Sequence, residues 1–294
     1  MEQVGAYTKM KQGIGFLLLF VLILFNIGLV EAQSPETPKL FKVGVGLGCS
    51  FAGYRDEIEA PINRYLNSLT YIIDGNIEKG PLLHSLNIDF FFGNSKTIAP
   101  YKGYEDKPHT SYRTTLEYSL NCHLWGGKTF PGYFGGEFRL LIFLTQDKDA
   151  DIRSRAPPTF IGLTSLDIYI CQKWVINEKN TLVFSVGYPL LGYAIRSAYA
   201  GIDEIWGDLY NTPFKFFTLG RFTSFHNYWD VYGGLKYQYK FNSLLEAYTG
   251  LGFEYSHISF PREKKDAIFR LSGGVTFTFW GKEHEANKKN NKRH

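Results

Sequence analysis

The chain has 294 residues, and aromatic residues make up 17% of it, with 20 Tyr and 25 Phe. A mean hydropathy of −0.18 excludes a bundle of transmembrane helices, because each such helix needs about 20 mostly apolar residues. The formal net charge of +4 is spread along the chain and forms no basic patch, so nucleic acid is not an expected partner.

The first 32 residues resemble a secretory signal peptide. Lys9 and Lys11 precede an apolar run at 14–30, and Val30-Glu31-Ala32 follows with small residues where signal peptidase cleaves. An uncleaved anchor helix is the alternative, but no basic flank follows the run. We therefore expect cleavage near Ala32 and a linker at residues 33–40 before the exported domain.

From residue 41 onward the chain alternates apolar and polar residues, which is the period of β-strands. In Trp229–Phe241, Val231 and Leu235 share one face, while Asp230 and Lys236 share the other. We count about ten such segments, with eight to twelve allowed, and a short helix or a further strand could lie around Leu66–Ile73. The segments are 41–51, 85–92, 115–124, 134–144, 160–173, 182–190, 214–225, 229–241, 245–255 and 268–280.

Several positions between and within these segments predict turns and irregularities. Gly126-Gly127, Asn177–Asn180 and Asn242-Ser243 are expected to be turns, and Pro189 is expected to bend its strand or form a bulge. Counting strand directions places the long connections 93–111 and 199–213 at the same end as the tight Asn242-Ser243 turn. Since periplasmic turns are short in outer-membrane barrels, this count indicates a missed strand or an incomplete one.

The last segment carries a resemblance to a known class of proteins. Ile268–Trp280 alternates and ends in Phe277-Thr278-Phe279-Trp280, similar to the aromatic-terminated strand that the barrel-assembly machinery recognises. Over residues 41–280 the chain resembles, in pattern, the porin-like outer-membrane β-barrel proteins common in Bacteroidetes. Such proteins usually stop at the aromatic residue, whereas here a basic tail at 281–294 follows, which we expect to be disordered.

The resemblance implies the fold, the location and the partners. It implies an all-β, transmembrane, up-and-down antiparallel β-barrel in the outer membrane of a Gram-negative envelope. The implied partners are outer-membrane lipid and the barrel-assembly machinery, the latter through Phe277, Phe279 and Trp280. Partners within an envelope complex are conceivable, but no residue identifies one.

The polar faces carry both signs of charge. Unpaired charges inside a narrow barrel are costly, so opposite signs should meet across strands. One interpretation is a plugged lumen held by ion pairs, which the small strand number favours, and the other is a narrow polar pore without an ion preference. The predicted network is Glu117, Glu137, Arg139, Asp167, Asp230, Lys236, Lys240, Glu246, Glu254 and Arg270.

The tripeptide His257-Ile258-Ser259 suggests a different function. Some outer-membrane lipid A deacylases and phospholipases use a His-x-Ser pair on the lipid-facing side of a strand. Alternation points His257 and Ser259 outward, but no orienting acid is evident, because Glu254 points inward and Glu263 lies in a loop. An interfacial histidine with a capping serine is the alternative interpretation.

No metal site or cofactor is expected, since the three cysteines, Cys49, Cys122 and Cys171, have wide and irregular spacing. We therefore expect a non-enzymatic membrane protein that is structural, a narrow channel or a subunit of an envelope complex. The first alternative is an outer-leaflet lipid hydrolase that uses His257 and Ser259. The second is a soluble periplasmic ligand-binding β-barrel, which would require the apolar faces to point inward.

Overall fold

The computed structural model describes residues 39–56, 60–97, 109–147, 159–196, 221–224, 227–259 and 263–280. The predicted signal peptide, nearly all of the linker and the basic tail lie outside the described residues. In the described part of the chain, no helix is both long and apolar enough to span a membrane. The strands are β1 Lys39–Asp56, β2 Ala60–Lys79, β3 Leu82–Thr97, β4 His109–Trp125, β5 Gly132–Asp147, β6 Thr159–Val175, β7 Asn180–Arg196, β8 Arg221–Thr223, β9 Tyr228–Lys240, β10 Leu245–Ile258 and β11 Lys264–Trp280.

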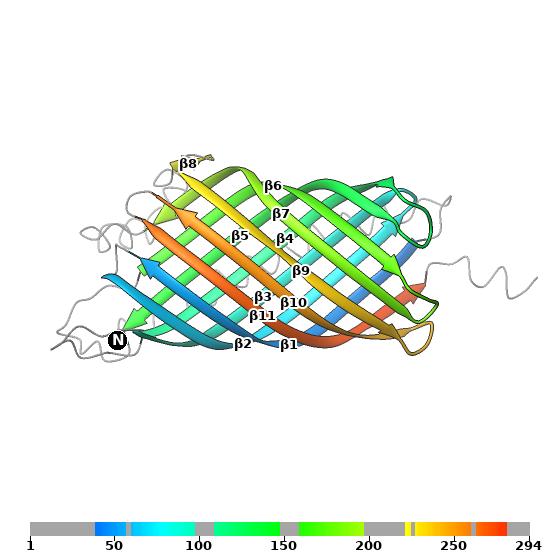
Figure 1. Cartoon of the computed structure of the whole chain (residues 1–294), viewed down its shortest axis with the longest axis horizontal. Helices are drawn as coiled ribbons and strands as arrows, with labels where there is room; N and C mark the ends of the chain where they lie inside the picture. The colour runs from blue at the N-terminus through cyan, green and yellow to red at the C-terminus, as the bar shows by residue number, and fades with distance from the viewer. Residues whose placement is uncertain are drawn as a thin grey trace, which may run out of the picture. The chain divides into compact units, whose positions relative to one another are not determined.

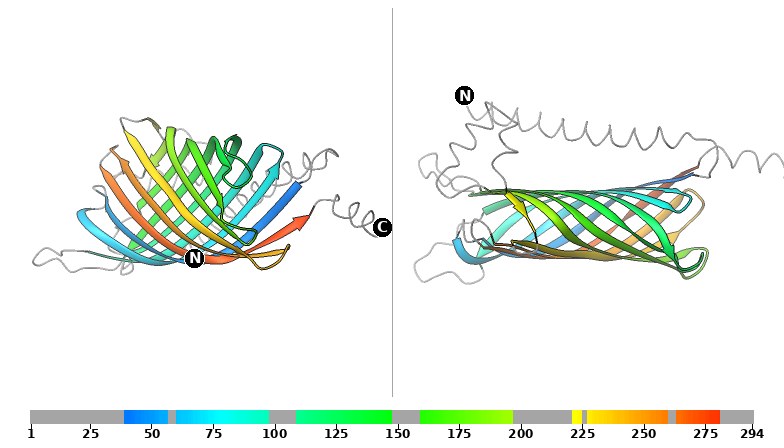
Figure 2. Two further views of the ribbon diagram at one scale, coloured as in Figure 1. Left: turned by 45° about the vertical axis from the view of Figure 1, so that its right-hand side comes forward. Right: turned by 90° about the horizontal axis from the view of Figure 1, so that it is seen from above.

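Ten of these strands form a closed antiparallel barrel (Figure 1). The hydrogen-bonded order is β6-β5-β4-β3-β2-β1-β11-β10-β9-β7, and β6 also pairs with β7, which closes the ring. The strands cross the barrel obliquely (Figures 1 and 2), as closure of a sheet into a barrel requires. The all-β, up-and-down antiparallel barrel predicted from the alternation is confirmed.

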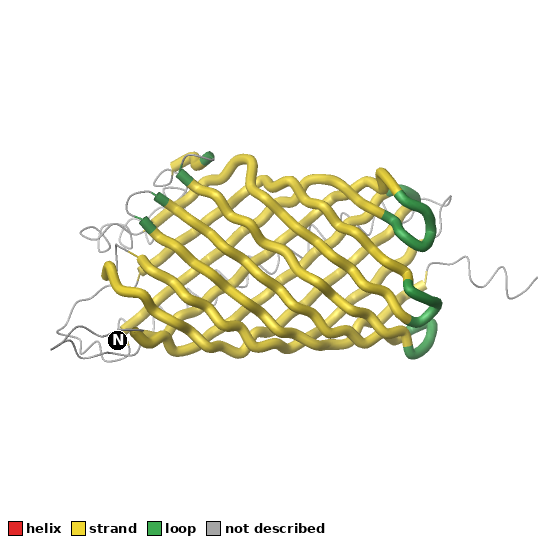
Figure 3. The backbone as a smooth tube through the Cα atoms, viewed as in Figure 1, coloured by secondary structure: helices red, strands yellow, loops and turns green. Residues whose placement is uncertain are grey.

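The two ends of the barrel differ in their connections. At one end, here called the turn end, residues 80–81, 126–131, 176–179 and 241–244 link successive strands (green in Figure 3). The predicted turns at Gly126-Gly127, Asn177–Asn180 and Asn242-Ser243 are all found there. Lys39 and Trp280, the first and last residues of the barrel strands, lie at the same end, because they begin β1 and end β11. The opposite end, here called the loop end, carries the connections after β1, β3, β5, β7 and β10.

Two of the predicted strands need correction. The segment around Leu66–Ile73 belongs to a full strand, β2, whereas in the predicted strand 214–225 only Arg221–Thr223 is described as strand, and it pairs with β7 alone. β7 pairs antiparallel with both β8 and β9, so these two run in the same direction and do not count as two crossings of the barrel. With β2 added and β8 not counted separately, the barrel has ten strands, and both β3 and β7 end at the loop end, which removes the conflict in the direction count.

A β-bulge lies at Pro189. Asp167 pairs with Pro189 and Leu166 pairs with Leu191, so Leu190 has no partner across the β6–β7 ladder. Proline lacks the N–H that a regular ladder position needs, and the extra residue shifts the alternation of faces by one. The predicted irregularity at Pro189 is confirmed.

The apolar rows face outward and the polar rows face the lumen. On β11, Phe277 and Phe279 are 46% and 53% exposed, whereas Thr276 and Thr278 between them are buried. Cys49 and Cys122 are exposed on the outer wall, and Cys171 is buried. A soluble barrel with its apolar rows packed inside would show the reverse pattern, so the soluble ligand-binding interpretation is wrong.

Candidate functional site

The lumen holds the largest set of interacting polar side chains, and its centre is crossed by an ion pair between opposite walls. The Arg113 guanidinium on β4 donates to both carboxylate oxygens of Glu254 on β10. In the closed ring of ten strands, β4 and β10 are separated by five steps along either arc, which is the greatest separation the ring allows. Arg113 and Glu254 are 3% and 8% exposed, so this ion pair is buried inside the barrel.

Arg139 on β5 extends this contact into a cluster. Its guanidinium lies 2.7 Å from Glu254 Oε2 and 3.3 Å from Glu117 Oε1, and it also donates to Asp230 Oδ2. Arg139 is thereby paired with carboxylates from β4, β9 and β10. A buried arginine in contact with several carboxylates is the arrangement that compensates for removing these charges from water.

Two further contacts complete what we call the central cluster. Arg270 on β11 donates to Asp89 Oδ2 on β3 at 2.9 Å. The hydroxyl of Tyr232 lies 2.5 Å from Glu137 Oε1 and 2.6 Å from Asp167 Oδ2. The central cluster comprises Asp89, Arg113, Glu117, Glu137, Arg139, Asp167, Asp230, Tyr232, Glu254 and Arg270.

Nearer the turn end, lysines take over the bridging role. Lys42 lies 2.8 Å from Glu246, and Lys236 lies 3.2 Å from Asp74 and 3.8 Å from the centre of the Tyr248 ring. Lys173 pairs with Glu78. The Lys42–Glu246 pair spans only the intervening β11, whereas the pairs from β9 to β2 and from β6 to β2 join strands four steps apart in the ring and so cross the lumen.

Glycines on the inner face make room for these long side chains. A Cβ atom on Gly46 would lie 2.1 Å from the Tyr248 hydroxyl, so the glycine leaves the space into which Tyr248 extends. The same argument holds for Gly187, where a Cβ atom would lie 2.2 Å from the ring of Tyr232. Gly46 and Gly187 therefore leave space for aromatic side chains from β10 and β9.

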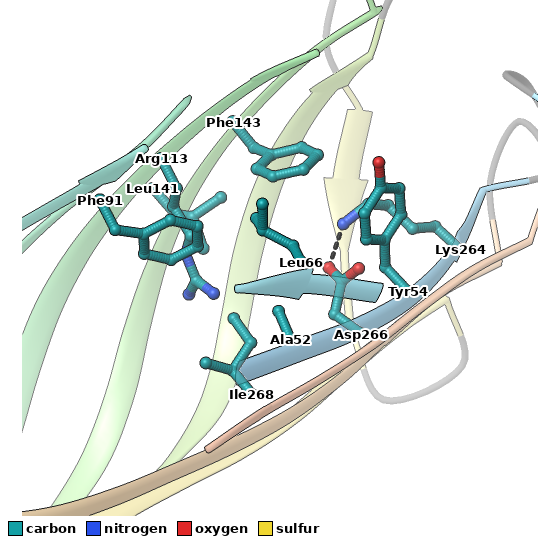
Figure 4. A pocket seen from close by; sticks show the side chains of 10 residues that line it. All are labelled: Ala52, Tyr54, Leu66, Phe91, Arg113, Leu141, Phe143, Lys264, Asp266 and Ile268. Atoms are coloured by element: carbon teal, nitrogen blue, oxygen red, sulfur yellow. Dashed lines mark hydrogen bonds and ion pairs between the residues drawn. The ribbon is translucent and has the colours of Figure 1, made fainter. Parts of the chain in front are cut away.

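The loop end of the lumen is lined differently. A cluster of buried apolar side chains, here called the apolar collar, comprises Ala52, Tyr54, Leu66, Phe91, Leu141, Phe143, Ile161, Leu163, Ala194, Tyr228, Ile258 and Ile268. Part of the collar surrounds a cavity of about 20 Å³, with Arg113 and the Lys264–Asp266 ion pair on its wall (Figure 4). A cavity of this size holds about one water molecule. Beyond it, Arg196 at the end of β7 pairs with Asp56 at the end of β1 at 2.6 Å.

The structure brings most of the sequence-predicted network together. Six of the ten predicted residues meet around Arg139 and Tyr232. Arg139 pairs with Glu117, Asp230 and Glu254, and Tyr232 bonds Glu137 and Asp167. Arg270 pairs with Asp89, while Lys236 and Glu246 belong to the bridges near the turn end. Lys240 is half-buried opposite Glu246 in the β9–β10 ladder, while Glu246 bonds Lys42.

The sequence interpretation missed Arg113, Asp74, Glu78, Asp56 and Arg196. Arg113 was missed because the predicted strand began at residue 115, although Arg113 continues the inward series of Thr115 and Glu117. Asp74 and Glu78 lay in a segment interpreted mainly as a connection. Extending each strand by its own alternation would have found all three.

His257 and Ser259 have separate hydrogen-bond partners in the described residues. His257 Nε2 lies 3.0 Å from Glu263 Oε1, so an acid does reach the histidine from the loop. The Ser259 hydroxyl, however, donates to the Asn227 carbonyl at 3.3 Å, and the described residues show no hydrogen bond between it and His257. Hydrogen bonds from Lys265 and His257 hold the pKa of Glu263 below its ordinary value. The geometry is that of a surface link between a strand end and a loop.

Two other expectations can be located on the structure. Among the described residues, no group of three or more His, Cys, Asp or Glu side chains is arranged to hold a metal ion. Phe277 and Phe279 face outward at the turn end, while the side chain of Trp280 lies outside the described part.

Comparison with known proteins gives likeness of fold only. No family model and no curated protein sequence matches the chain. Three similar solved structures are the outer membrane protease OmpT from Escherichia coli, an outer membrane channel from Pseudomonas putida F1 and the outer membrane protein OprG from Pseudomonas aeruginosa. Their identities are 9%, 9% and 10% and their TM-scores 0.46, 0.41 and 0.37. They cover 84%, 84% and 83% of this chain, and the matches span 99%, 97% and 97% of their own chains. All three are outer-membrane barrels of Gram-negative bacteria; the Bacteroidetes affiliation stays a prediction, and no activity is transferred from them.

Proposed function

We propose that this chain is an outer-membrane β-barrel whose lumen is closed by ion pairs, with a structural role or a role as a subunit of an envelope complex. The observation that carries the proposal is the Arg113–Glu254 pair between opposite strands. A conducting pore needs a continuous hydrated path, but here the central charges are buried and paired with one another. The burial and pairing of these central charges favour a plugged lumen over a narrow channel.

The outer wall supports the membrane location. Phe253, Leu271 and Phe277 are among the many large apolar side chains that are exposed to the surroundings. Apart from the short β8, every strand has at least 13 residues, whereas about 9–11 tilted residues span the hydrocarbon of a bilayer. The strand ends therefore have the length to project beyond the hydrocarbon on both sides.

The arrangement of the ends supports an orientation. In outer-membrane barrels the periplasmic turns are short and the extracellular loops longer. We accordingly assign the turn end to the periplasm, which also places the outward Phe277 and Phe279 there, where the assembly machinery would bind them. The loop end, with the apolar collar beneath it, would face the cell exterior.

Planar-bilayer conductance of the refolded protein tests the proposal. We expect the wild type to insert without producing current steps, because the central cluster blocks the lumen. Replacing Arg113, Arg139 and Glu254 together by alanine should produce steps, whereas Leu251→Ala on the outer wall should not. Steady ohmic steps from the wild-type protein would overturn the proposal.

A further inference from the structure

Two carboxyl groups of the central cluster lie side by side on neighbouring strands, with no ion pair from either of them to a cation in the described part of the chain. Glu137 on β5 and Asp167 on β6 are direct partners in the β5–β6 ladder. They are 5% and 3% exposed. Like charges directly opposite each other on a sheet are destabilising, and burial makes the repulsion stronger.

Both carboxyl groups meet the same hydroxyl. Tyr232 on β9 extends past β7, and its hydroxyl lies 2.5 Å from Glu137 Oε1 and 2.6 Å from Asp167 Oδ2. A phenol has one proton to donate, and an ionised carboxylate can only accept. Two carboxylates cannot both be satisfied by this proton, so the second contact needs a proton on one of the carboxyl groups, which then donates to the phenolic oxygen.

The nearest arginine does not supply the missing hydrogen-bond donor to the acid pair. Arg139 lies over the Tyr232 ring at 4.2 Å, but its nitrogens are directed to Glu117, Asp230 and Glu254.

The number of charged groups in the central cluster is an independent reason to expect a protonated carboxyl group. Its six acids, Asp89, Glu117, Glu137, Asp167, Asp230 and Glu254, face three arginines, Arg113, Arg139 and Arg270. A buried cluster with this excess of carboxyl groups must hold protons or cations. Within the described ranges no metal-binding group of three ligands is present, which favours the proton.

The groups around the acid pair come from every neighbouring strand. Glu117 approaches from β4, Arg139 from β5, Tyr169 from β6 and Glu254 from β10. From β7, Gly187 leaves the space that the Tyr232 ring occupies. The surroundings therefore contain more acids than bases and would not stabilise two ionised carboxylates side by side.

We infer that Glu137 and Asp167 form a buried acid pair that shares one proton through the Tyr232 hydroxyl, and that losing this proton loosens the plug. No covalent bond other than O–H is involved: Tyr232 donates to one carboxylate while the other carboxyl group, protonated, donates to Tyr232. The inference rests on the proposed closed lumen. It adds that the centre of the closed lumen holds a proton between Glu137 and Asp167. The barrel would hold its plug at neutral pH and weaken it in alkali.

Infrared spectroscopy of the folded barrel in detergent tests the inference directly. At neutral pH the wild type should show the carbonyl band of a protonated carboxylic acid. Glu137→Gln and Asp167→Asn should each weaken that band, because the remaining carboxylate of the pair can then accept the Tyr232 proton. Glu246→Gln, which alters an acid paired with Lys42, is the matched control and should retain it.

The outcomes separate this inference from the proposed function. Absence of the band in the wild type, or an undiminished band in either of the two pair variants, would overturn the shared proton. Failure of closure would instead appear as conductance of the wild type at neutral pH, which the infrared measurement does not depend on. As a second readout, alkaline pH should lower the unfolding temperature of the wild type more than that of Glu137→Gln, and equal losses would contradict the role in the plug.

Discussion

The central lumen and its loop end are lined by the same faces of the same strands, yet they are filled in opposite ways. On β5, Glu137 and Arg139 belong to the central cluster, while Leu141 and Phe143 on the same face belong to the apolar collar. Outside, no such change occurs, since the outward rows are apolar along the membrane-facing part of each strand.

The difference shows which surface is constrained by lipid. Hydrocarbon accepts only apolar side chains over the outer wall, whereas the interior needs only to be filled and to have its polar groups paired. The centre of the lumen is filled by paired charged side chains, and the loop end is filled by packed apolar side chains. Substitutions in the central cluster, on the outer wall and in the apolar collar should therefore destabilise the barrel for three different reasons.

The largest effect is expected in the central cluster. Arg139→Leu leaves Glu117, Asp230 and Glu254 without their shared cation, and breaking a buried ion pair in this way costs about 3–5 kcal/mol. The free energy of unfolding, measured by urea titration in lipid vesicles, checks it. Lys240→Ala, at the half-buried rim, is the control and should cost less than about 1 kcal/mol. Equal losses in the two variants would mean that Arg139 is not buried among acids.

The next effect concerns the outer wall. Leu251 is 44% exposed on the outward face of β10. Leu251→Arg should destabilise the inserted barrel by about 2–4 kcal/mol, because a charge at the bilayer midplane is costly. Leu251→Ala should cost much less. If the arginine variant were as stable as the alanine variant in lipid, this face would not meet hydrocarbon.

A smaller loss is expected in the apolar collar. Leu141→Ala enlarges the cavity beside it and should cost about 2–3 kcal/mol, the lower part of the range for buried leucines, because the cavity can admit water. The same urea titration measures it. Leu141→Met, which keeps the volume, is the matched control and should be close to the wild type. A loss as large as that of Arg139→Leu would show that the collar, rather than the ion pairs, holds the barrel shut.

The smallest effect is expected at the strand end of β10. Ser259→Ala removes only exposed hydrogen bonds to Asn227 and should change the free energy of unfolding by less than about 0.5 kcal/mol. Lipid A and phospholipid hydrolysis assays should give the same result for the wild type and this variant. A hydrolytic activity that disappears only in Ser259→Ala would revive the hydrolase alternative.

The sequence predicted the outer wall well because the alternation of residues such as Phe269, Leu271 and Phe277 is imposed by lipid on every strand. It predicted the inner face of the strands, but not what each inner residue contacts. Arg113 and Glu254 are 141 residues apart, and their contact depends on strand number and register, which alternation does not define. The apolar collar was missed for a related reason, since Leu141 and Phe143 on a nominally polar face do not break the pattern of outward residues.

The central claim is that an ion pair between opposite strands closes the lumen, and a double-mutant cycle on Arg113 and Glu254 tests it most directly. Unfolding free energies would be measured for Arg113→Ala, Glu254→Ala and the double variant in the same vesicles. The account predicts a coupling free energy of about 1–3 kcal/mol, as for side chains in one buried network. A coupling indistinguishable from zero would mean that the two side chains do not meet across the barrel.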